Sequence, residues 1–377
     1  MVGGIVAEFN PFHNGHEYLL KKAREISDEI VVVMSPNVCQ RGEFTVFDKY
    51  SRARAAVMCG ADLVLELPCI SAVAAAADFS AAAVKILSEA GAERLIFGSE
   101  CGSTDKLYEA LYKLRAAESG GSITEAMKEG ESYPKTVGRI IGDGFRESPN
   151  DILAMEYLKN LPSHMTAEAV ARTGVGHNSE APNGDFASAS LIRGLGIPEA
   201  ERFIPPSAYK LFSSLTAFPK ERGELLELSF LKRLSEEQIA SCPGVTEGLE
   251  NRIKAAISEA KSLEEALFSV KTKRYTLSRI RRIFLSLYLG ISKEDEKAPQ
   301  YIRVLALNEK GRDIIHRAKK NSSLPIITSL ADALKMGKDA AAAAKRESFS
   351  CDLYNFSLKN GAPDGDDFRF SPIPFNK

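Results

Sequence analysis

The sequence GIVAEFNPFHNGHEYLL, residues 4–20, joins a short apolar run to an amphipathic pattern. The run before Phe9 is typical of a buried strand, and HEYLLKKAREIS, residues 16–27, repeats its apolar positions at helical spacing. Between the two patterns lies His13-Asn14-Gly15-His16. The stretch predicts a strand, a turn and a helix, with two histidines where the helix begins.

The same alternation continues through the first two hundred residues. Further strands are predicted in EIVVVMS (29–35), ADLVLELP (61–68), AERLIFGSE (92–100) and TAEAVAR (166–172). Helical patterns separate them, among them DKYSRARAAVMCG (48–60), the alanine-rich stretch 72–87, NDILAMEYLKNL (150–161) and SASLIRGLG (188–196). Strands that alternate with helices indicate βαβ units and a parallel sheet. We therefore expect a doubly wound α/β domain over residues 1–197.

The pattern changes in the second part of the chain, residues 198–377. Residues 222–292 are almost entirely helical in pattern, with charged faces and apolar stripes. Residues 301–329 then predict strand, helix and strand, a small βαβ element, and the alanine tract near residue 340 is helical. We expect a mainly helical region that ends in an irregular tail.

Composition excludes several classes of protein. The chain has 377 residues, 44% hydrophobic and 26% charged, which is ordinary for a globular protein. Its net charge of −1 excludes a molecule-wide attraction to nucleic acid, so any such surface must be local. Six cysteines lie scattered without metal-ligand spacing, and Glu8 interrupts the first apolar run, which argues against a signal peptide. These features predict a cytoplasmic protein with reduced thiols.

The two histidines lie where an α/β sheet binds phosphates. Ligands bind at the carboxyl ends of parallel strands, and a helix N-terminus there attracts anions. Gly15 lets a nucleotide approach the backbone, and His13 and His16 can donate to an α-phosphate whose charge grows during attack. Ser188 and Ser190 of SASLIR begin a later helix and can hold the other phosphates. In both motifs a simple helix cap remains the structural alternative.

HNGH together with SASLIR resembles the HIGH/ISTSS pairing of the nucleotidyltransferase superfamily. GIVAEFNPFHNGH, QRGEFTVFDKYSRARAAVMCGADLVLELP, LIFGSE and SPNDILAMEYLK extend the resemblance to the bacterial tRNA(Met) cytidine acetate ligases, and KTKRYTLSRIRRIFL continues it. The resemblance implies a HUP-like nucleotidyltransferase fold. It also implies that ATP and acetate form acetyl-adenylate, and that the acetyl group passes to the wobble cytidine of elongator tRNA(Met).

The resemblance also implies the ATP-binding residues. Its main segment is Ala7, Glu8, Phe9, Asn10, Pro11, Phe12, His13, Asn14, Gly15, His16, Glu17, Tyr18, Leu19 and Leu20, with His13 and His16 catalytic. Further nucleotide contacts are implied at Gly98, Asn150 and Arg172, and Ser188 and Ser190 would hold the pyrophosphate. No carboxylate cage is visible, so Mg²⁺ is expected to arrive with ATP.

A basic segment in the helical region predicts contact with the tRNA backbone. It comprises Lys271, Lys273, Arg274, Arg279, Arg281 and Arg282, and no acidic residue interrupts it up to Gly290. Leu277, Ile280, Phe284 and Leu287 share one helical face, so we expect the charges to point outward. A solvated surface is the alternative, but six cations without neighbouring acids favour a phosphate backbone.

Other residues leave their roles open. Asp48, Lys49 and Arg52 begin a helix, where a solvated face and a substrate contact explain them equally well. His177 is either a phosphate ligand or a polar loop residue, whereas Asp62 and Glu66 favour structural hydrogen bonds. Two other functions also stay open, namely a small-molecule adenylyltransferase acting on a phosphate-bearing metabolite, and a non-catalytic tRNA-binding protein that senses ATP.

Overall fold

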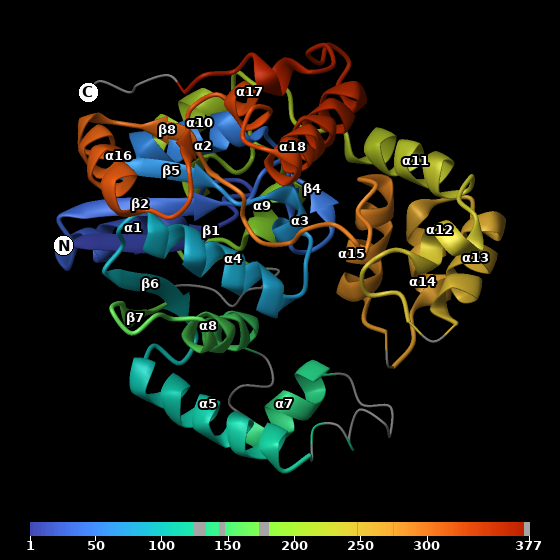
Figure 1. The fold of residues 1–377 in the computed structure, drawn as a ribbon, viewed down its shortest axis with the longest axis horizontal. Coiled ribbons are helices and arrows are strands. Elements are labelled where there is room, and N and C mark those ends of the chain that lie inside the picture. The colour runs from blue at the N-terminus through green and yellow to red at the C-terminus, as the bar shows by residue number, and fades with distance from the viewer. Residues whose placement is uncertain are drawn as a thin grey trace.

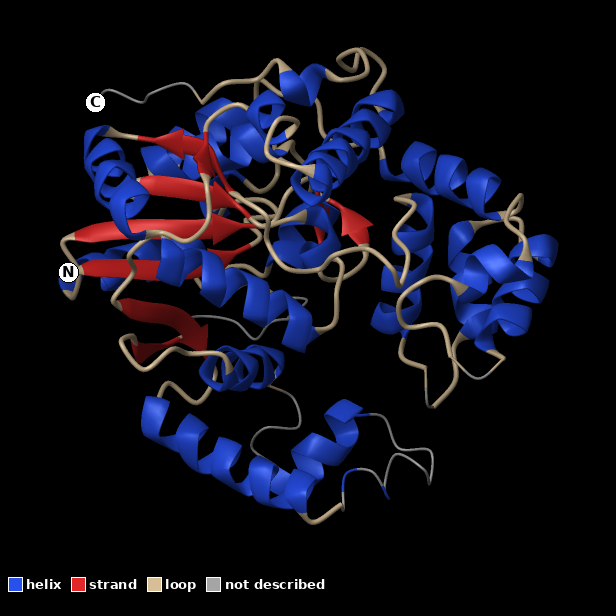
Figure 2. Cartoon of the chain, viewed as in Figure 1, coloured by secondary structure: helices blue, strands red, loops and turns tan. Residues whose placement is uncertain are grey.

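The computed structural model describes residues 1–121, 123, 125, 133–142, 148–172, 181–246, 248–273 and 275–372. Within these ranges, a seven-stranded sheet in the order β7-β6-β1-β2-β5-β8-β9 forms the core of the larger, α/β part of the molecule (Figures 1 and 2). Its strands are β1 (Val2–Ala7), β2 (Glu29–Met34), β5 (Leu63–Glu66), β6 (Arg94–Ser99), β7 (Thr166–Ala171), β8 (Ile302–Leu307) and β9 (Ile326–Ile327). The strands from β1 to β7 in this sheet pair in parallel, as the sequence predicts.

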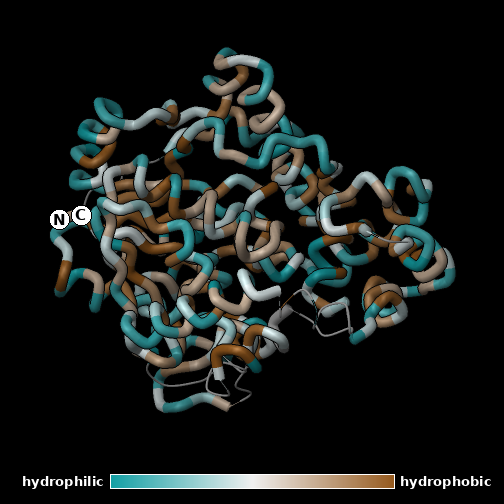
Figure 3. Tube along the Cα trace, turned by 60° about the horizontal axis from the view of Figure 1, so that its bottom comes forward, coloured by the Kyte–Doolittle hydropathy of each residue, from teal (hydrophilic) through white to brown (hydrophobic). Residues whose placement is uncertain are grey.

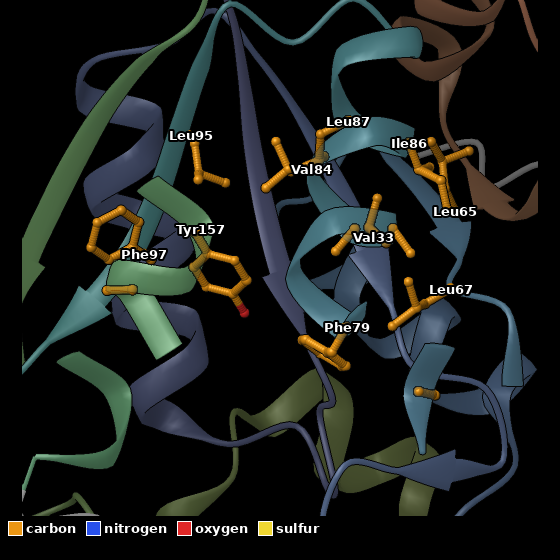
Figure 4. Packing of buried hydrophobic residues seen from close by; sticks show 14 of the residues in the cluster. Val33, Leu65, Leu67, Phe79, Val84, Ile86, Leu87, Leu95, Phe97 and Tyr157 are labelled. Carbon is orange, nitrogen blue, oxygen red and sulfur yellow. The ribbon is translucent and has the colours of Figure 1, made fainter. Parts of the chain in front are cut away.

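Helices cover both faces of the sheet, and alternate residues of each inner strand enter different cores. Val31 and Val33 of β2 pack with Phe79 and Leu87, as Figure 4 shows for Val33 and its neighbours. Ile30 and Val32 of the same strand instead pack in a second cluster, with the helices on the opposite face. Strands that are buried on both faces need continuous apolar sequence, which explains the EIVVVM run.

The helices of this α/β body follow the predicted order. They are α1 (Asn14–Glu25), α2 (Lys49–Met58), α3 (Cys69–Ala72), α4 (Ala76–Glu89), α5 (Thr104–Ser119), α7 (Tyr133–Ile141), α8 (Pro149–Lys159), α9 (Ala189–Leu195), η2 (Glu201–Phe203) and α10 (Pro206–Phe212). The sequence patterns did not predict α5 and α7. They also did not predict the short hairpin of β3 (Val38–Cys39) and β4 (Glu43–Phe44).

The predicted helical region is confirmed. It consists of α11 (Lys220–Leu231), α12 (Glu236–Ala240), α13 (Leu249–Glu259), α14 (Leu263–Val270) and α15 (Leu277–Tyr288). These helices have a hydrophobic cluster of their own, which includes Ile253, Leu267 and Phe284. Figure 1 shows α15 between β4 and the rest of this region. Figure 3 shows hydrophobic segments gathered at the sheet and hydrophilic segments on many outer turns.

The predicted βαβ element is also present, as β8, α16 (Glu309–Asn321) and β9. It extends the first sheet, however, because β8 pairs antiparallel with β5. This pairing covers the edge of β5, which would otherwise expose unpaired backbone groups. The chain ends with α17 (Leu330–Ala333), α18 (Lys338–Ser357) and η3 (Asp366–Phe368), packed back on the α/β body. The limit at residue 197 stays a prediction. No helix among the described residues is long and apolar enough to cross a membrane.

Candidate active site

His13 and His16 form the N-terminal cap of α1, at the carboxyl end of β1. The Nδ1 of His13 accepts a hydrogen bond from the Gly15 amide at 3.0 Å, and the Nδ1 of His16 accepts one from the His13 amide at 3.3 Å. The two rings stack with centroids 3.7 Å apart. A ring nitrogen that accepts carries no proton, so the neutral rings hold their proton on Nε2. The cap and the catalytic interpretation are therefore compatible, because the cap fixes which nitrogen can donate.

Gly15 is required by the cap itself. A Cβ on Gly15 would lie 2.9 Å from Cε1 of His13, closer than carbon atoms approach. Glycine therefore lets the imidazole of His13 lie against the helix start.

Arg52 holds the loops that follow β1 and β2, and it is fully buried. Its guanidinium donates to the carbonyls of Glu8, Ser35, Pro36 and Phe47, at 2.9 Å for Phe47. The alternative of a solvated face is therefore wrong for Arg52. It is also wrong for Lys49, whose ammonium forms ion pairs inside the protein. Helix α2 packs this face against the sheet, so its cations bind carbonyls and carboxylates instead of water.

Two segments far apart in sequence meet at the turn before the histidines. Ser188 caps α9 by accepting from the Leu191 amide at 3.1 Å. Arg193 donates to the carbonyl of Asn10 at 2.8 Å and to the hydroxyl of Ser190 at 3.3 Å. The structure thus brings the SASLIR and HNGH motifs together. Arg193, the residue that joins them, was not predicted as a site residue.

The other residues of the 7–20 segment have mixed environments. Phe9, Phe12 and Leu20 are buried in the core beneath the motif, so their side chains support the turn. Asn14 donates to the carbonyls of Asp185 and Arg202, at 2.7 and 2.9 Å. The remaining positions, which are Ala7, Glu8, Pro11, Glu17, Tyr18 and Leu19, are buried or half-buried around the start of α1.

Gly98 and Arg172 lie side by side at the carboxyl ends of β6 and β7. A Cβ on Gly98 would lie 3.5 Å from Cγ of Arg172, and the Arg172 amide donates to the carbonyl of Ser99 at 3.0 Å. β6 is the parallel neighbour of β1 in the sheet, so these residues and the histidines lie at the same end of the sheet, where the parallel strands have their carboxyl ends. His177 lies outside the described residues.

Asn150 begins α8 and donates to the carboxylate of Glu100. The adjacent Asp151 is buried and accepts from the Ser99 hydroxyl at 2.5 Å and from the Glu100 and Cys101 amides at 3.0 Å. The carboxylate of Asp151 therefore fixes the loop after β6. Asp151 was not predicted as a site residue, although an acid two residues after Pro149, in the first turn of a helix, is a usable signal.

Part of the basic segment faces the protein. Arg281 forms an ion pair with Glu43 of β4 at 3.5 Å, Arg282 donates to the Gln40 carbonyl at 3.3 Å, and Arg279 donates to the Gly244 carbonyl at 2.8 Å. A Cβ on Gly42 would lie 2.5 Å from the backbone of Arg281, so the hairpin turn packs directly on α15.

The expectation of an uncompensated cation is therefore wrong for Arg281, which pairs with an acid, whereas Arg279 and Arg282 donate to backbone carbonyls and are only half-buried. The hairpin that contacts Arg281 and Arg282 was not predicted. Lys271 and Lys273 are exposed, and Arg274 lies outside the described residues. In the described part of the chain, no group of three or more metal-ligating side chains comes together.

A doubly wound sheet with this histidine cap, joined to a serine-bearing helix start, defines an ATP-binding nucleotidyltransferase. The family model for the HIGH nucleotidyl transferases matches residues 1–363. The chain is 35% identical to the tRNA(Met) cytidine acetate ligase of Thermoanaerobacter sp. (strain X514), over 97% of both chains, and 34% identical to that of Acetivibrio thermocellus, over 95% of both. It belongs to the tRNA(Met) cytidine acetate ligase family.

Solved structures support the same assignment. The apo structure of Thermotoga maritima TmcAL superposes with a TM-score of 0.89 at 30% identity, covering 99% of both chains. A second structure of that protein, bound with alpha-thio ATP, gives the same values. The predicted family, fold class, ligase function and use of ATP are confirmed.

Proposed function

We propose that the HNGH cap and SASLIR carry the first of two half-reactions. In it, an acetate oxygen attacks the α-phosphate of ATP, the bond to the bridging oxygen breaks, and acetyl-adenylate and pyrophosphate form. The cap is the observation that carries the proposal. In both histidines, Nδ1 accepts a hydrogen bond from a backbone amide at the helix start, so the ring proton lies on Nε2, which can act as a donor. Donors that are preorganised for developing negative charge act most strongly in the transition state.

The remaining residues of the site bind ATP. Gly98 and Arg172 line the nucleotide side, Asn150 lies at the start of α8, and Ser188 and Ser190 hold the departing pyrophosphate. Mg²⁺ enters with the ATP phosphates. The support is that the described residues bring no ligand cluster together, and Mg²⁺ is commonly bound through substrate phosphates.

In the second half-reaction, N4 of the wobble cytidine attacks the acetyl carbonyl. The new N–C bond replaces the anhydride C–O bond, AMP leaves, and N4 loses one proton. The substrate is elongator tRNA(Met), which we place in the cytoplasm, and the exposed Lys271 and Lys273 contact its backbone. In this proposal residues 1–197 bind ATP and residues 198–377 bind the tRNA. The division is not complete, because residues 302–327 of the second part add two strands to the sheet of the first part.

Acetate-dependent exchange of pyrophosphate into ATP, followed by acetyl transfer to a tRNA(Met) transcript, tests the proposal. The ligase should show both reactions. An adenylyltransferase for a phosphate-bearing metabolite should show no acetate dependence, and an ATP sensor should show no exchange. Either result would contradict the proposal.

A further inference from the structure

A cavity of about 430 Å³ lies between the α/β body and the helical region. Pro11, Ser190 and Arg193 border it on the side of the HNGH turn, and Arg281 and Leu267 border it on the helical side. Its volume lies in the range of small-molecule pockets and is far larger than an acetate ion needs. It therefore has room for a ligand larger than acetate beside the proposed acetate-activating site.

Glu227 of α11 lines this cavity and is 6% exposed. Across the described residues, no hydrogen bond reaches its carboxyl group, although Glu224 and Arg281 act on it electrostatically. Burial, reinforced by Glu224, raises the pKa of Glu227 to about 8, so the group is largely protonated at neutral pH. The carboxyl group of Glu227 therefore faces the cavity with both its donor and its acceptor capacity unused by the described residues, and a ligand in the cavity can bind to it.

Three other features suit a planar, polar ligand. The rings of Phe44 and Phe218 line the cavity with centroids 5.0 Å apart, which offers an aromatic surface for stacking. The Nε of Arg281 is buried without a hydrogen-bond partner. Glu43 lies 3.5 Å from both Arg193 and Arg281, so it links the HNGH turn to the helical wall.

We propose that this cavity receives the cytosine base after it leaves the anticodon stack, with Glu227 paired to its Watson–Crick edge. The inference rests on the proposed function. A protonated carboxyl group donates to N3 and accepts from N4–H, which matches that edge. Enzymes that modify a base commonly take it out of the stack and bind it by such hydrogen bonds and by stacking. The pocket then delivers N4 beside the adenylate site, because both share Ser190 and Arg193.

The test compares three substitutions on α11 by two assays of the full chain. The assays are acetate-dependent pyrophosphate exchange, which needs no tRNA, and acetyl transfer to a tRNA(Met) transcript. Glu227→Leu removes both hydrogen bonds and should lower the ratio of transfer to exchange about 10- to 100-fold. Glu227→Gln retains one donor and one acceptor and should keep most of the ratio. Glu221→Leu, at an exposed position of the same helix, is the control and should keep the ratio of the parent.

A normal ratio in Glu227→Leu would overturn the inference, as would equal losses in the Leu and Gln variants. If Glu227→Leu fails to fold, Ala217→Trp decides, because it fills the cavity from an exposed position. That variant should also lose transfer relative to exchange, and an unchanged ratio would overturn the inference. Absence of acetate-dependent exchange in the parent protein would instead contradict the proposed function.

Discussion

At the scale of single residues, the site depends on side chains with two tasks. His13 and His16 cap α1 and are the proposed donors to the α-phosphate. Gly15 lets the His13 ring lie close to the helix start. Substitutions that keep one task and remove the other can therefore separate chemistry from stability.

His13→Asn should retain the cap, because asparagine is among the best N-cap residues, but it lacks the imidazole. We expect unfolding free energy close to that of the parent and pyrophosphate exchange lowered about 10²–10³-fold. His13→Ala should lose the same activity and about 1 kcal/mol of stability in addition. Exchange near the parental rate in His13→Asn, measured beside urea unfolding, would remove His13 from the chemistry.

His16→Ala should depress adenylate formation much more than ATP binding, since its proposed role lies in the transition state. Titration calorimetry gives the affinity for ATP, and the exchange assay gives the rate. Equal losses in the two quantities would indicate that His16 binds ground-state ATP.

Gly98→Val should weaken ATP binding while the protein stays folded. A Cβ at this position meets only ordinary van der Waals contact with Arg172, but the two further methyl groups occupy space assigned to the nucleotide. We expect this overpacking to make the free energy of ATP binding less favourable by about 1–3 kcal/mol. Gly98→Ala is the matched control, with a smaller effect in calorimetry. Unchanged ATP affinity in a folded Gly98→Val variant would place the nucleotide elsewhere.

At the scale of elements, α15 joins the α/β body to the helical region. One face packs in the helical core through Ile280 and Phe284, while Arg281 and Arg282 contact the β3–β4 hairpin. Charges that lie in one basic run therefore have different environments. Lys271 and Lys273, just before α15, are exposed and are the residues proposed to contact the tRNA. Arg281 and Arg282, within α15, hold the helical region to the hairpin.

The double variant Lys273→Ala, Arg274→Ala should weaken tRNA binding and flatten its salt dependence. Each lost phosphate contact lowers the slope by about one. Filter binding across a salt series measures both quantities, and pyrophosphate exchange should survive. Lys319→Ala, Lys320→Ala removes two exposed lysines of α16 and serves as the control. An unchanged slope in the first variant would leave the run as a solvated surface.

At the scale of the whole molecule, the end of the chain is held by buried charges beside the sheet. Asp367 accepts from Lys49 at 3.0 Å and from Arg303 at 2.9 Å, and both cations also pair with Glu66. Burial alone would raise the pKa of Asp367, but Lys49 and Arg303 outweigh it and hold that pKa well below its usual range. The two cations and the two anions balance. Removing one of them therefore leaves a buried charge without its counter-charge.

Asp367→Asn should cost about 3–5 kcal/mol at pH 7, measured by urea unfolding. Because the pKa of Asp367 is lowered on folding, its contribution is present above about pH 4 and is lost as the pH falls toward the folded value. The difference between parent and variant should therefore narrow in acid. Asp366→Asn, at a neighbouring exposed aspartate, should change stability by less than about 0.5 kcal/mol. A constant difference from pH 7 to pH 3 would contradict the ion-pair explanation.

The sequence by itself determined the elements and the motif of the site. Apolar runs and helical periods predicted the parallel strands, most helices and the βαβ element, because each pattern depends on neighbours within a few residues. HNGH after the first strand located the histidine cap. Its resemblance to a family supplied the reaction.

Only the tertiary structure decided which charges are buried and which residues meet. From the sequence, Arg52 and Lys49 could belong to a solvent-exposed helix face, but the sheet and the end of the chain bury both side chains. Glu43 pairs with Arg281 and Asp367 with Lys49, across sequence separations that no local pattern records. From the sequence pattern alone, Glu227 is expected to be an ordinary exposed acidic residue of an amphipathic helix. Its buried place in the cavity arises because α11 packs against α14, α15 and α18 and faces α9 and the hairpin across the cavity, and burial depends on which surfaces meet in space.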